Sequence, residues 1–416
     1  MIALGCIADD FTGGTDVAAA LRRAGMSVTL LFDVPDGEIG APSTDAVVIA
    51  LKTRTIPPNV AVRHALDALG WLQKHDVDRV YFKYCSTFDS TDEGNIGPVA
   101  DALLEALGES TTVVCPASPE HGRTTYLGHH FVGDRLLAES SMRDHPLTPM
   151  RESRLDVVLG TQTDGDIGLL TLPVVLAGPE RASAELRQVA ESGKRYVVTD
   201  ATSDVDLQTI AAAASHLRLL TGGAGLAGAW GHLLDREVAT PATGHQLPVG
   251  DAVVLAGSCS AATLAQVQRA REHFPAHRLD PVATPDPQEL LDTARTWLRQ
   301  HWGSGPVLLY SSAGPEDRSH GLAAMGARTP EVLERTLGDL AREAVALGAE
   351  RVVVAGGETS GAVVQALGID QVVVAGEADR GVPWCLTAAQ PPVALLLKSG
   401  NFGSEDLLVR ATKEQL

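Results

Sequence analysis

Short apolar runs alternate with helix-like segments along most of the chain, and this alternation constrains the fold more than any other feature. In the first half we expect helices near 15–24, 60–73 and 96–107, and strands at 2–8, 27–33, 45–51, 79–85, 111–117, 168–175, 195–201 and 216–223. In the second half the strand-like runs lie at 251–260, 305–314, 351–361 and 394–403. Strands that alternate with helices usually form a mainly parallel sheet covered by helices. The predicted fold class is therefore α/β.

The stretch 236–250, REVATPATGHQLPVG, interrupts this pattern with prolines, glycines and threonines, as an interdomain linker does. A chain of 416 residues, 44% of them hydrophobic, can also bury more than one core. We predict two domains, 1–235 and 251–416, each with a mainly parallel sheet flanked by helices. Within the first, 118–155 is rich in Gly, His, Pro and Arg and weakly periodic, which predicts a long functional excursion.

The formal net charge of -19 argues against a nucleic-acid or anionic-membrane partner, because both need a basic surface. An anionic substrate must then meet locally clustered Lys and Arg. The five cysteines form no CxxC pair and lie mostly in apolar stretches, which predicts buried thiols in a reducing compartment. No apolar run approaches the length of a membrane span. These features together predict a cytoplasmic protein.

Residues 355–368, AGGETSGAVVQALG, place glycines and hydroxyls between a predicted strand and a predicted helix. A helix that begins at the carboxyl end of a strand points free backbone N–H groups at an anion, and small residues admit a phosphate closely. The alternative is a tight turn with an N-cap, which would need one glycine and one hydroxyl. We predict a phosphate-binding turn formed by Gly356, Gly357, Glu358, Thr359, Ser360 and Gly361.

Two further segments have a related form. Residues 256–263, AGSCSAAT, place Ser258 after a strand, and 395–408, LLLKSGNFGSEDLL, carry Lys398 at a strand end with Gly400 and Gly403 around an Asn. Both could line the same phosphate-binding site. The first could equally be an ordinary N-cap and the second a plain left-handed turn, and the sequence leaves these readings open.

Two familiar nucleotide motifs do not apply to this chain. Residues 223–228, GAGLAG, match G-x-G-x-x-G, but the helix after them runs into the predicted linker and no second strand with an acidic ribose-binding residue follows. A Walker A lysine motif is absent from the whole sequence. We therefore predict neither a dinucleotide-binding unit nor a P-loop.

The predicted strand ends of the first half carry charged and hydroxyl side chains instead of glycines. Basic groups spaced over several strand ends suit a small carboxylate, which Arg can bind through two parallel hydrogen bonds. Alternatively, Lys52 and Arg54 form structural salt bridges with Asp9 or Asp10. The predicted substrate-binding residues are Lys52, Arg54, Lys83, Ser86, Thr87 and Arg123.

Asp9 and Asp10 end the first predicted strand. Asp10 is our predicted acceptor for the proton of a substrate hydroxyl, with Asp9 orienting the group or a neighbouring Lys; the alternative is that Asp10 or Thr12 only caps the following helix. No tightly bound metal is predicted, because His121, His129 and His130 lack the spacing of a zinc site.

With these residues in view, the sequence resembles the four-carbon acid sugar kinase family, most closely its 3-oxo-tetronate kinases, over nearly the whole chain. The resemblance rests on ADDFTG at 8–13, ALKTRTIP at 50–57, YFKYCSTFDSTDEGNIGPV at 81–99, HPLTPM at 145–150, GGETSGAV at 356–363 and KSGNFG at 398–403. Gly14 departs from the family pattern, in which alanine is expected. The resemblance implies an N-terminal acid-sugar domain, a C-terminal ATP domain, and transfer of phosphate to the terminal hydroxyl of a 3-oxo-tetronate. Such a phosphoryl transfer needs Mg²⁺ to offset charge.

Other functions remain open at this point. D-threonate or D-erythronate could be the substrate instead, and the sequence does not decide whether copies of the chain form a homo-oligomer. A nicotinamide-dependent dehydrogenase would need the missing acidic ribose residue. A non-catalytic sugar-acid sensor would not need a second domain with phosphate-binding turns.

Overall fold

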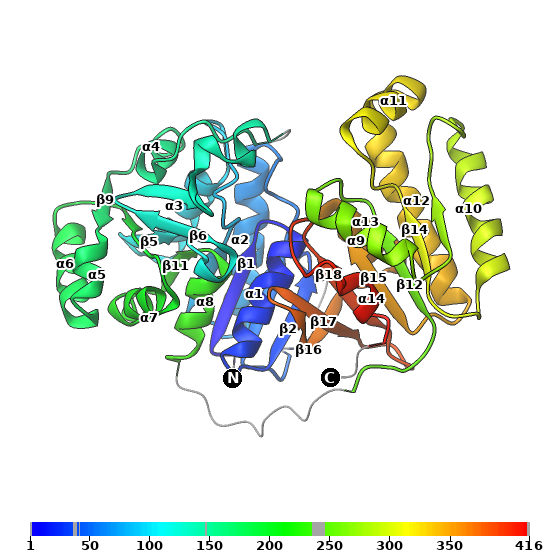
Figure 1. Cartoon of the computed structure of the whole chain (residues 1–416). Helices are drawn as coiled ribbons and strands as arrows, with labels where there is room; N and C mark the ends of the chain where they lie inside the picture. The colour runs from blue at the N-terminus through cyan, green and yellow to red at the C-terminus, as the bar shows by residue number, and fades with distance from the viewer. Residues whose placement is uncertain (1, 36–39, 41, 146–147, 235–245, 414–416) are drawn as a thin grey trace. The chain divides into compact units, whose positions relative to one another are not determined.

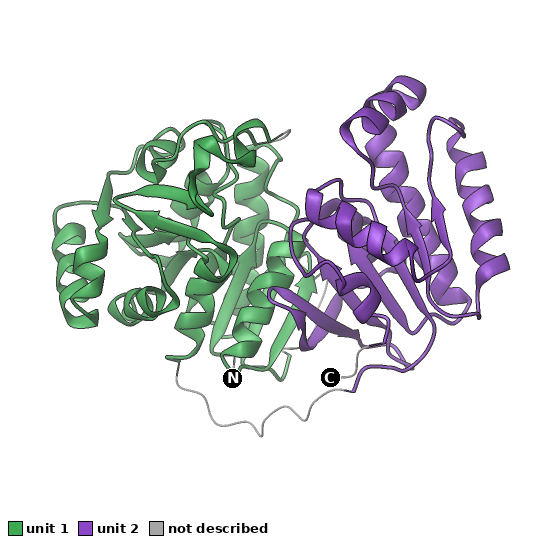
Figure 2. Ribbon diagram, viewed as in Figure 1, with its two compact units in different colours: residues 1–241 green, residues 242–416 purple. Residues whose placement is uncertain are grey.

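The computed structural model describes residues 2–35, 40, 42–145, 148–234 and 246–413. The chain divides into two compact units, Met1–Pro241 and Ala242–Leu416 (Figure 2). Most of the predicted linker, 236–245, lies outside the described residues, while 246–250 are described.

Unit 1 contains a parallel sheet with the strand order β2-β3-β1-β4-β11-β5-β10-β9. All of its strands except β9 are buried along their whole length, which explains why they appear in the sequence as continuous apolar runs. Because the strands run in one direction, their carboxyl ends meet at one edge. The strands are β1 (Leu4–Ala8), β2 (Val28–Phe32), β3 (Ala46–Ala50), β4 (Val80–Lys83), β5 (Thr112–Cys115), β9 (Ile167–Leu170), β10 (Tyr196–Thr199) and β11 (Leu219–Gly222).

Helices cover both faces of this sheet (Figure 1). One face packs against α2 (Pro58–Lys74) and α3 (Ile96–Leu107), and Ile7, Val47 and Phe82 point into the core formed there. The next residues along the strands face the opposite side. There α1 contacts α8, α8 contacts α7, and α7 contacts α6. Their bounds are α1 (Phe11–Arg23), α6 (Pro179–Glu191), α7 (Asp204–Ala213) and α8 (Ala224–Gly231), and two short helices are α4 (Leu155–Gly160) and α5 (Leu172–Leu176).

The predicted excursion 118–155 forms a small antiparallel sheet of its own, in the order β6-β7-β8. Its strands are β6 (Arg123–Tyr126), β7 (His129–Val132) and β8 (Arg135–Leu136), with 3-10 turns at Pro119–His121, Leu137–Glu139 and Ser141–Asp144. Strands this short leave almost no periodic signal in the sequence. The turn between the first two uses Leu127 and Gly128, both at positive φ, the geometry of a tight hairpin.

Unit 2 has the strand order β13-β14-β12-β15-β18-β17-β16. The pairs from β13 to β18 are parallel, whereas β17 is antiparallel to both of its neighbours. The hairpin of β16 and β17 was not predicted. The strands are β12 (Ala252–Ala256), β13 (Ala276–Arg278), β14 (Val307–Tyr310), β15 (Arg351–Ala355), β16 (Gln371–Asp379), β17 (Val382–Thr387) and β18 (Ala394–Lys398).

The helices of unit 2 fall into two packed groups. In one, α12 (Thr329–Ala346) contacts α10 (Pro287–His301), α11 (Pro315–Met325) and α13 (Gly357–Leu367). In the other, α9 (Ala261–Arg271) packs against α14 (Leu407–Arg410). Both units are therefore α/β layers with a mainly parallel sheet. Of the helices in the described ranges, none is long and apolar enough to cross a membrane.

Candidate active site

Arg54 joins the two acids that follow β1. Its Nε and Nη2 atoms donate to the two oxygens of Asp9 at 2.8 and 2.7 Å, and Nη2 also donates to Oδ1 of Asp10 at 2.7 Å. The three residues meet because β1 and β3 are neighbouring parallel strands whose carboxyl ends lie together. Burial raises the pKa of Asp9 although the charge of Arg54 opposes this. The salt-bridge alternative from the sequence is thus present for Arg54.

Asp10 is also the N-cap of α1. Its side chain accepts hydrogen bonds from the Gly13 backbone N–H at 2.7 Å and from the Thr12 hydroxyl at 2.8 Å. Burial favours the neutral acid, but the charges of Arg54 and Lys83 and these two hydrogen bonds leave the pKa of Asp10 below its ordinary value. Asp10 is therefore a stable carboxylate, and its side chain is 24% exposed against 7% for Asp9.

Lys83, at the end of β4, is buried and lies near a carboxylate that sequence reasoning missed. Its Nζ donates to the Tyr84 carbonyl at 2.9 Å and lies 3.8 Å from Oδ2 of Asp16 on α1. Oδ1 of Asp16 has no hydrogen-bond partner among the described residues, and burial raises the pKa of this acid. The sequence offered only one clue, an Asp directly before the apolar run VAAAL of a predicted helix.

The other predicted substrate residues have different surroundings. Lys52 is exposed, with Nζ 5.1 Å above the centre of the Phe11 ring. The Thr87 hydroxyl is buried and donates to Asp89 at 2.5 Å, and the Ser86 carbonyl accepts a hydrogen bond from His130 at 2.7 Å. Arg123 donates through Nη1 to the His121 carbonyl, and its buried Nε has no partner within the described chain.

The histidines of the excursion support its fold. His130 is fully buried between Ser86 and Thr125, and burial lowers its pKa to about 4. At neutral pH its Nε2–H therefore donates to the Ser86 carbonyl while Nδ1 accepts from the Thr125 hydroxyl. Among the described residues, no group of three or more His, Cys, Asp or Glu side chains could hold a metal ion.

In unit 2, α13 begins at the predicted phosphate-binding turn. Gly356 is its N-cap, has φ +132 and makes no side-chain cap hydrogen bond. The first N–H groups of a helix have no partner inside it, so those of the first turn are available to an anion. Ser360 is fully buried and returns its hydroxyl to the Gly356 carbonyl at 2.7 Å, so it stabilises the turn from within. Glu358 is exposed on the same turn.

The three predicted phosphate-binding segments lie together within unit 2. A Cβ atom added to Gly356 would lie 3.0 Å from the Ser258 backbone nitrogen, and one added to Gly400 would lie 2.3 Å from Oγ of Ser258. The segments converge because β12, β15 and β18 are neighbouring parallel strands with their carboxyl ends at one edge. Gly403 has φ +85, a left-handed backbone that favours glycine.

Lys398 is buried beside the turn formed by residues 399–404, hereafter the nucleotide turn. Its Nζ donates to Oγ1 of Thr263 at 3.0 Å and to the Gly400 carbonyl at 3.2 Å. The Ser260 and Thr263 hydroxyls donate to the same carbonyl at 2.6 and 2.8 Å. Burial lowers the pKa of Lys398 to about 7. The base of the turn is therefore tied to α9 and to β18.

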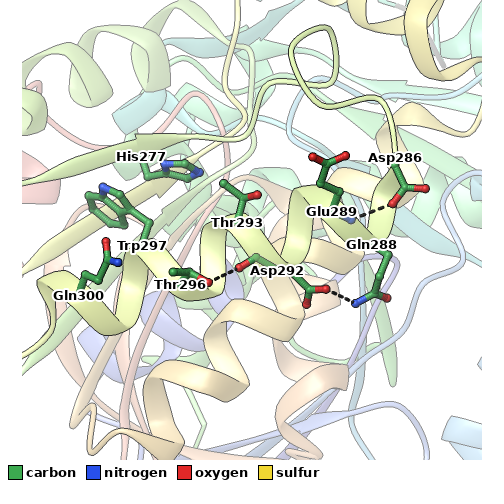
Figure 3. Close-up of a pocket in the computed structure, with 9 residues that line it drawn as sticks. All are labelled: His277, Asp286, Gln288, Glu289, Asp292, Thr293, Thr296, Trp297 and Gln300. Atoms are coloured by element: carbon green, nitrogen blue, oxygen red, sulfur yellow. Dashed lines mark hydrogen bonds between the residues drawn. The ribbon is translucent and has the colours of Figure 1, made fainter.

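A hollow of about 700 Å³ lies elsewhere in unit 2, along α10 (Figure 3). Its carboxylates would repel a phosphate, and none of its residues was predicted from the sequence as part of a site. We therefore place the candidate phosphate site at the strand ends and not here. The lining residues are His277, Asp286, Gln288, Glu289, Asp292, Thr293, Thr296, Trp297 and Gln300.

Two family models match this chain, and they cover most of its length. Residues 4–230 match the model of a sugar-binding N-terminal domain, and residues 253–408 match that of a nucleotide-binding C-terminal domain. A 3-oxo-tetronate kinase of Burkholderia multivorans is 46% identical over 99% of this chain and 96% of its own. One of Pseudomonas fluorescens is 44% identical over 98% of this chain and 96% of its own.

A solved structure shares the fold. A chain from Salmonella typhimurium LT2 superposes with a TM-score of 0.89 at 39% identity, and the match covers 100% of both chains. Family models and full-length relatives thus agree, and the protein belongs to the four-carbon acid sugar kinases, a family of ATP-dependent sugar-acid kinases.

Proposed function

We propose that the protein transfers the γ-phosphate of ATP to the terminal hydroxyl of a 3-oxo-tetronate. The observation that carries the proposal is the full-length similarity to relatives named 3-oxo-tetronate kinase, at 46% and 44% identity. The two units support it by their chemistry. Unit 1 offers cations at strand ends for a sugar acid, and unit 2 offers glycines and an uncapped helix start for a polyphosphate.

In unit 1, Arg54 and Lys83 are the proposed partners of the substrate carboxylate. Arg54 donates hydrogen bonds from Nε and Nη2 to Asp9 and Asp10, while Nη1 makes no hydrogen bond with the described residues. The two acids thus hold the guanidinium in one orientation and leave the two N–H donors of Nη1 for a ligand. Lys52, Ser86, Thr87 and Arg123 remain proposed contacts of the sugar acid.

Asp10 remains the proposed acceptor of the substrate proton, with Asp9 as the alternative. Both oxygens of Asp9 face Arg54, whereas Oδ2 of Asp10 receives a hydrogen bond from Thr12 alone within the described chain. Asp10 is also the more exposed of the two acids. A carboxylate in this role accepts a hydrogen bond from the attacking hydroxyl and orients it.

In unit 2, the proposed ATP site combines the first turn of α13 with Ser258, Gly400 and Gly403. Phosphoryl transfer needs Mg²⁺ to offset charge on the phosphates, and that ion is usually held by the phosphates, water and one or two carboxylates. Glu358, exposed on the first turn of α13, fits such a partial ligand. A site completed by the nucleotide also agrees with the lack of a three-ligand metal cluster among the described residues.

The test is an ADP-release assay with the full chain, Mg²⁺ and ATP, run against a panel of 3-oxo-tetronates, D-threonate and D-erythronate. We expect turnover with a 3-oxo-tetronate, and mass spectrometry should identify a product with phosphate on the terminal oxygen. Turnover with threonate or erythronate alone would assign the protein to another branch of the family. ATP consumption that no acid accelerates would refute the proposal.

A further inference from the structure

Gln266, on α9, fastens the nucleotide turn through its side-chain amide. The residue is fully buried, and Nε2 lies 3.0 Å from each of the carbonyl oxygens of Phe402, Gly403 and Ser404. An amide nitrogen carries two protons, so the three carbonyls share them. Oε1 is buried without a hydrogen-bond partner among the described residues. Burying an amide with its oxygen unpaired lowers the stability of the fold. The three contacts of Nε2 are therefore the reason we look for a role of Gln266 in the turn.

The position of Gln266 on its helix suits this contact. Ser260, Thr263 and Gln266 follow one another at intervals of three along α9, so they lie along one side of the helix. The first two donate to the Gly400 carbonyl and the third to the carbonyls beyond it. The last three residues of the turn, 402–404, thus receive three hydrogen bonds from α9 through one side chain.

The turn that Gln266 holds is conformationally demanding. Gly403 has φ +85, and a Cβ atom added there would lie 2.2 Å from Leu407 and 3.3 Å from Nε2 of Gln266. A glycine-containing turn is flexible unless its carbonyls are held, because glycine has more accessible backbone conformations than other residues. Ser404 is held from its other side by Asp379, which accepts from its N–H and its hydroxyl at 2.9 and 2.7 Å.

We propose that Gln266 is a positioning residue for ATP, which it serves by fixing the carbonyls of the nucleotide turn before the nucleotide binds. It does not touch the phosphates itself. This inference rests on the proposed function, because it takes the turn to be part of the ATP site. A turn fixed in advance costs less entropy when a ligand binds, so the loss of Gln266 should weaken ATP binding more than it slows turnover at saturation.

Unit 1 contains a matched arrangement that supplies the control. Nδ2 of Asn95 donates to the carbonyls of Thr53, Arg54 and Ile56 at 2.5, 3.3 and 2.9 Å, and its Oδ1 is also buried without a partner in the described chain. Asn95 therefore fastens the segment that carries Arg54. Replacing Asn95 removes a buried amide of the same kind as Gln266. It should weaken the binding of the acid sugar and leave the affinity for the nucleotide unchanged.

The experiment measures the Kd of a non-hydrolysable ATP analogue with Mg²⁺ by calorimetry, in the full chain and in Gln266→Met and Asn95→Leu. For Gln266→Met we expect a roughly tenfold rise in Kd and in KM for ATP, a kcat within about twofold of the parent, and an unchanged KM for the acid. Asn95→Leu should raise the KM for the acid and leave the Kd and the KM for ATP unchanged. Thermal unfolding of each variant confirms that it is folded at the assay temperature.

A third variant, Gln266→Glu, tests for the hydrogen bond itself. Its carboxylate would repel the three carbonyls, whereas the protonated acid can donate to one of them. The ratio of its Kd to that of the parent should therefore fall as the pH is lowered from 8 to 6, and the ratio for Gln266→Met should stay constant.

The outcomes distinguish the positioning role of Gln266 from the proposed function of the protein. A parent protein that does not bind the analogue refutes the ATP site and with it the proposed function. If the parent binds and the folded Gln266→Met protein binds equally well, the proposed function stands and the positioning role is wrong. Equal losses of acid and nucleotide binding in Gln266→Met would also overturn it, because they would point to general destabilisation.

Discussion

The guanidinium of Arg54 lies against both carboxylate oxygens of Asp9, at 2.8 and 2.7 Å, in the side-by-side geometry of a two-point salt bridge. The pair is mostly buried, with side-chain exposures of 21% and 7%. A pair of this kind is hard to modify on one side only, because the partner then keeps an uncompensated charge. Arg54 consequently has a structural and a proposed binding role, and an experiment must separate them.

Arg54→Met should raise the KM for the acid sugar and leave the KM for ATP nearly unchanged. Losing a charge-assisted hydrogen bond costs about 1.5 to 3 kcal/mol, which corresponds to a factor of roughly ten or more. The variant should also lower the free energy of unfolding, by about 3 kcal/mol, because Asp9 becomes unpaired. Adding Asp9→Asn should restore much of the stability without restoring the KM. Recovery of both by the double variant would assign Arg54 a structural role alone.

Asp10→Asn should reduce kcat by a factor of about a hundred to ten thousand, the usual effect of losing a general base. Asn is also a good N-cap, so α1 should keep its start and the melting temperature should change little. Asp9→Asn should be less damaging to kcat. Steady-state kinetics with separate binding measurements decide between them, and near-parental turnover of Asp10→Asn would leave it as a cap only.

Lys398 should make ATP binding depend on pH. Burial lowers its pKa to about 7, so above that pH it is mostly neutral in the free protein, whereas phosphate nearby favours the charged form. The Kd of the ATP analogue should therefore rise with pH above 7, by at most about tenfold per unit, and binding at pH 8 should take up a proton. Calorimetry in buffers of different ionisation enthalpy measures this uptake, and Lys398→Met should abolish it.

The same lysine affects folding in a predictable direction. Its folded-state pKa is below the ordinary value, so between pH 7 and about 10 the unfolded chain binds more protons than the folded one. The contribution of Lys398 to the free energy of unfolding should rise across this window. Urea titrations of the parent and of Lys398→Met at pH 7 and 9 should show a rise that the variant lacks; equal pH dependence in both would contradict the assignment.

Gly400→Ala should weaken ATP binding several-fold with little loss of stability. The new methyl group would lie 2.3 Å from the Ser258 hydroxyl, which is the mobile end of a side chain and would rotate away from the proposed phosphate site. Gly314→Ala is the matched control in the same unit, since no atom lies within 4 Å of its added Cβ. A Kd for the ATP analogue that is unchanged in Gly400→Ala would place the phosphates elsewhere.

The sequence predicted the parts of this molecule that depend on local pattern. Buried parallel strands are continuous apolar runs, so nearly all of those strands were found. Because their carboxyl ends share an edge, Arg54 could be expected near Asp9 and Ser258 near Gly356, and the structure has both pairs close together. The hairpin at 371–387 was not predicted, although its first strand, QVVVAGEAD, contains three consecutive valines. Within 168–175, the sequence LPVV was taken as strand but begins α5, because Pro173 suits the first turn of a helix.

The side chains that hold the sites could not be found in the same way. Asp16 is significant only because β4 brings Lys83 to within 3.8 Å of it, and Gln266 only because β18 delivers the turn at 402–404 to its amide. Nothing in the residues next to them in sequence marks these contacts. They arise from packing between segments 67 and about 137 positions apart, which a single sequence does not reveal.

The proposed nucleotide site draws on Ser258, on Gly356 and on Gly400, and the third reaches its place only because the chain reverses direction at β17 before β18 joins β15. β18 lies between β15 and β17 in the strand order, and it is buried along its whole length. A growing chain on the ribosome that ends before β18 therefore lacks both an inner strand of this sheet and the turn that completes the proposed site. On this proposal, ATP can stabilise unit 2 only after residues 398–404 have emerged.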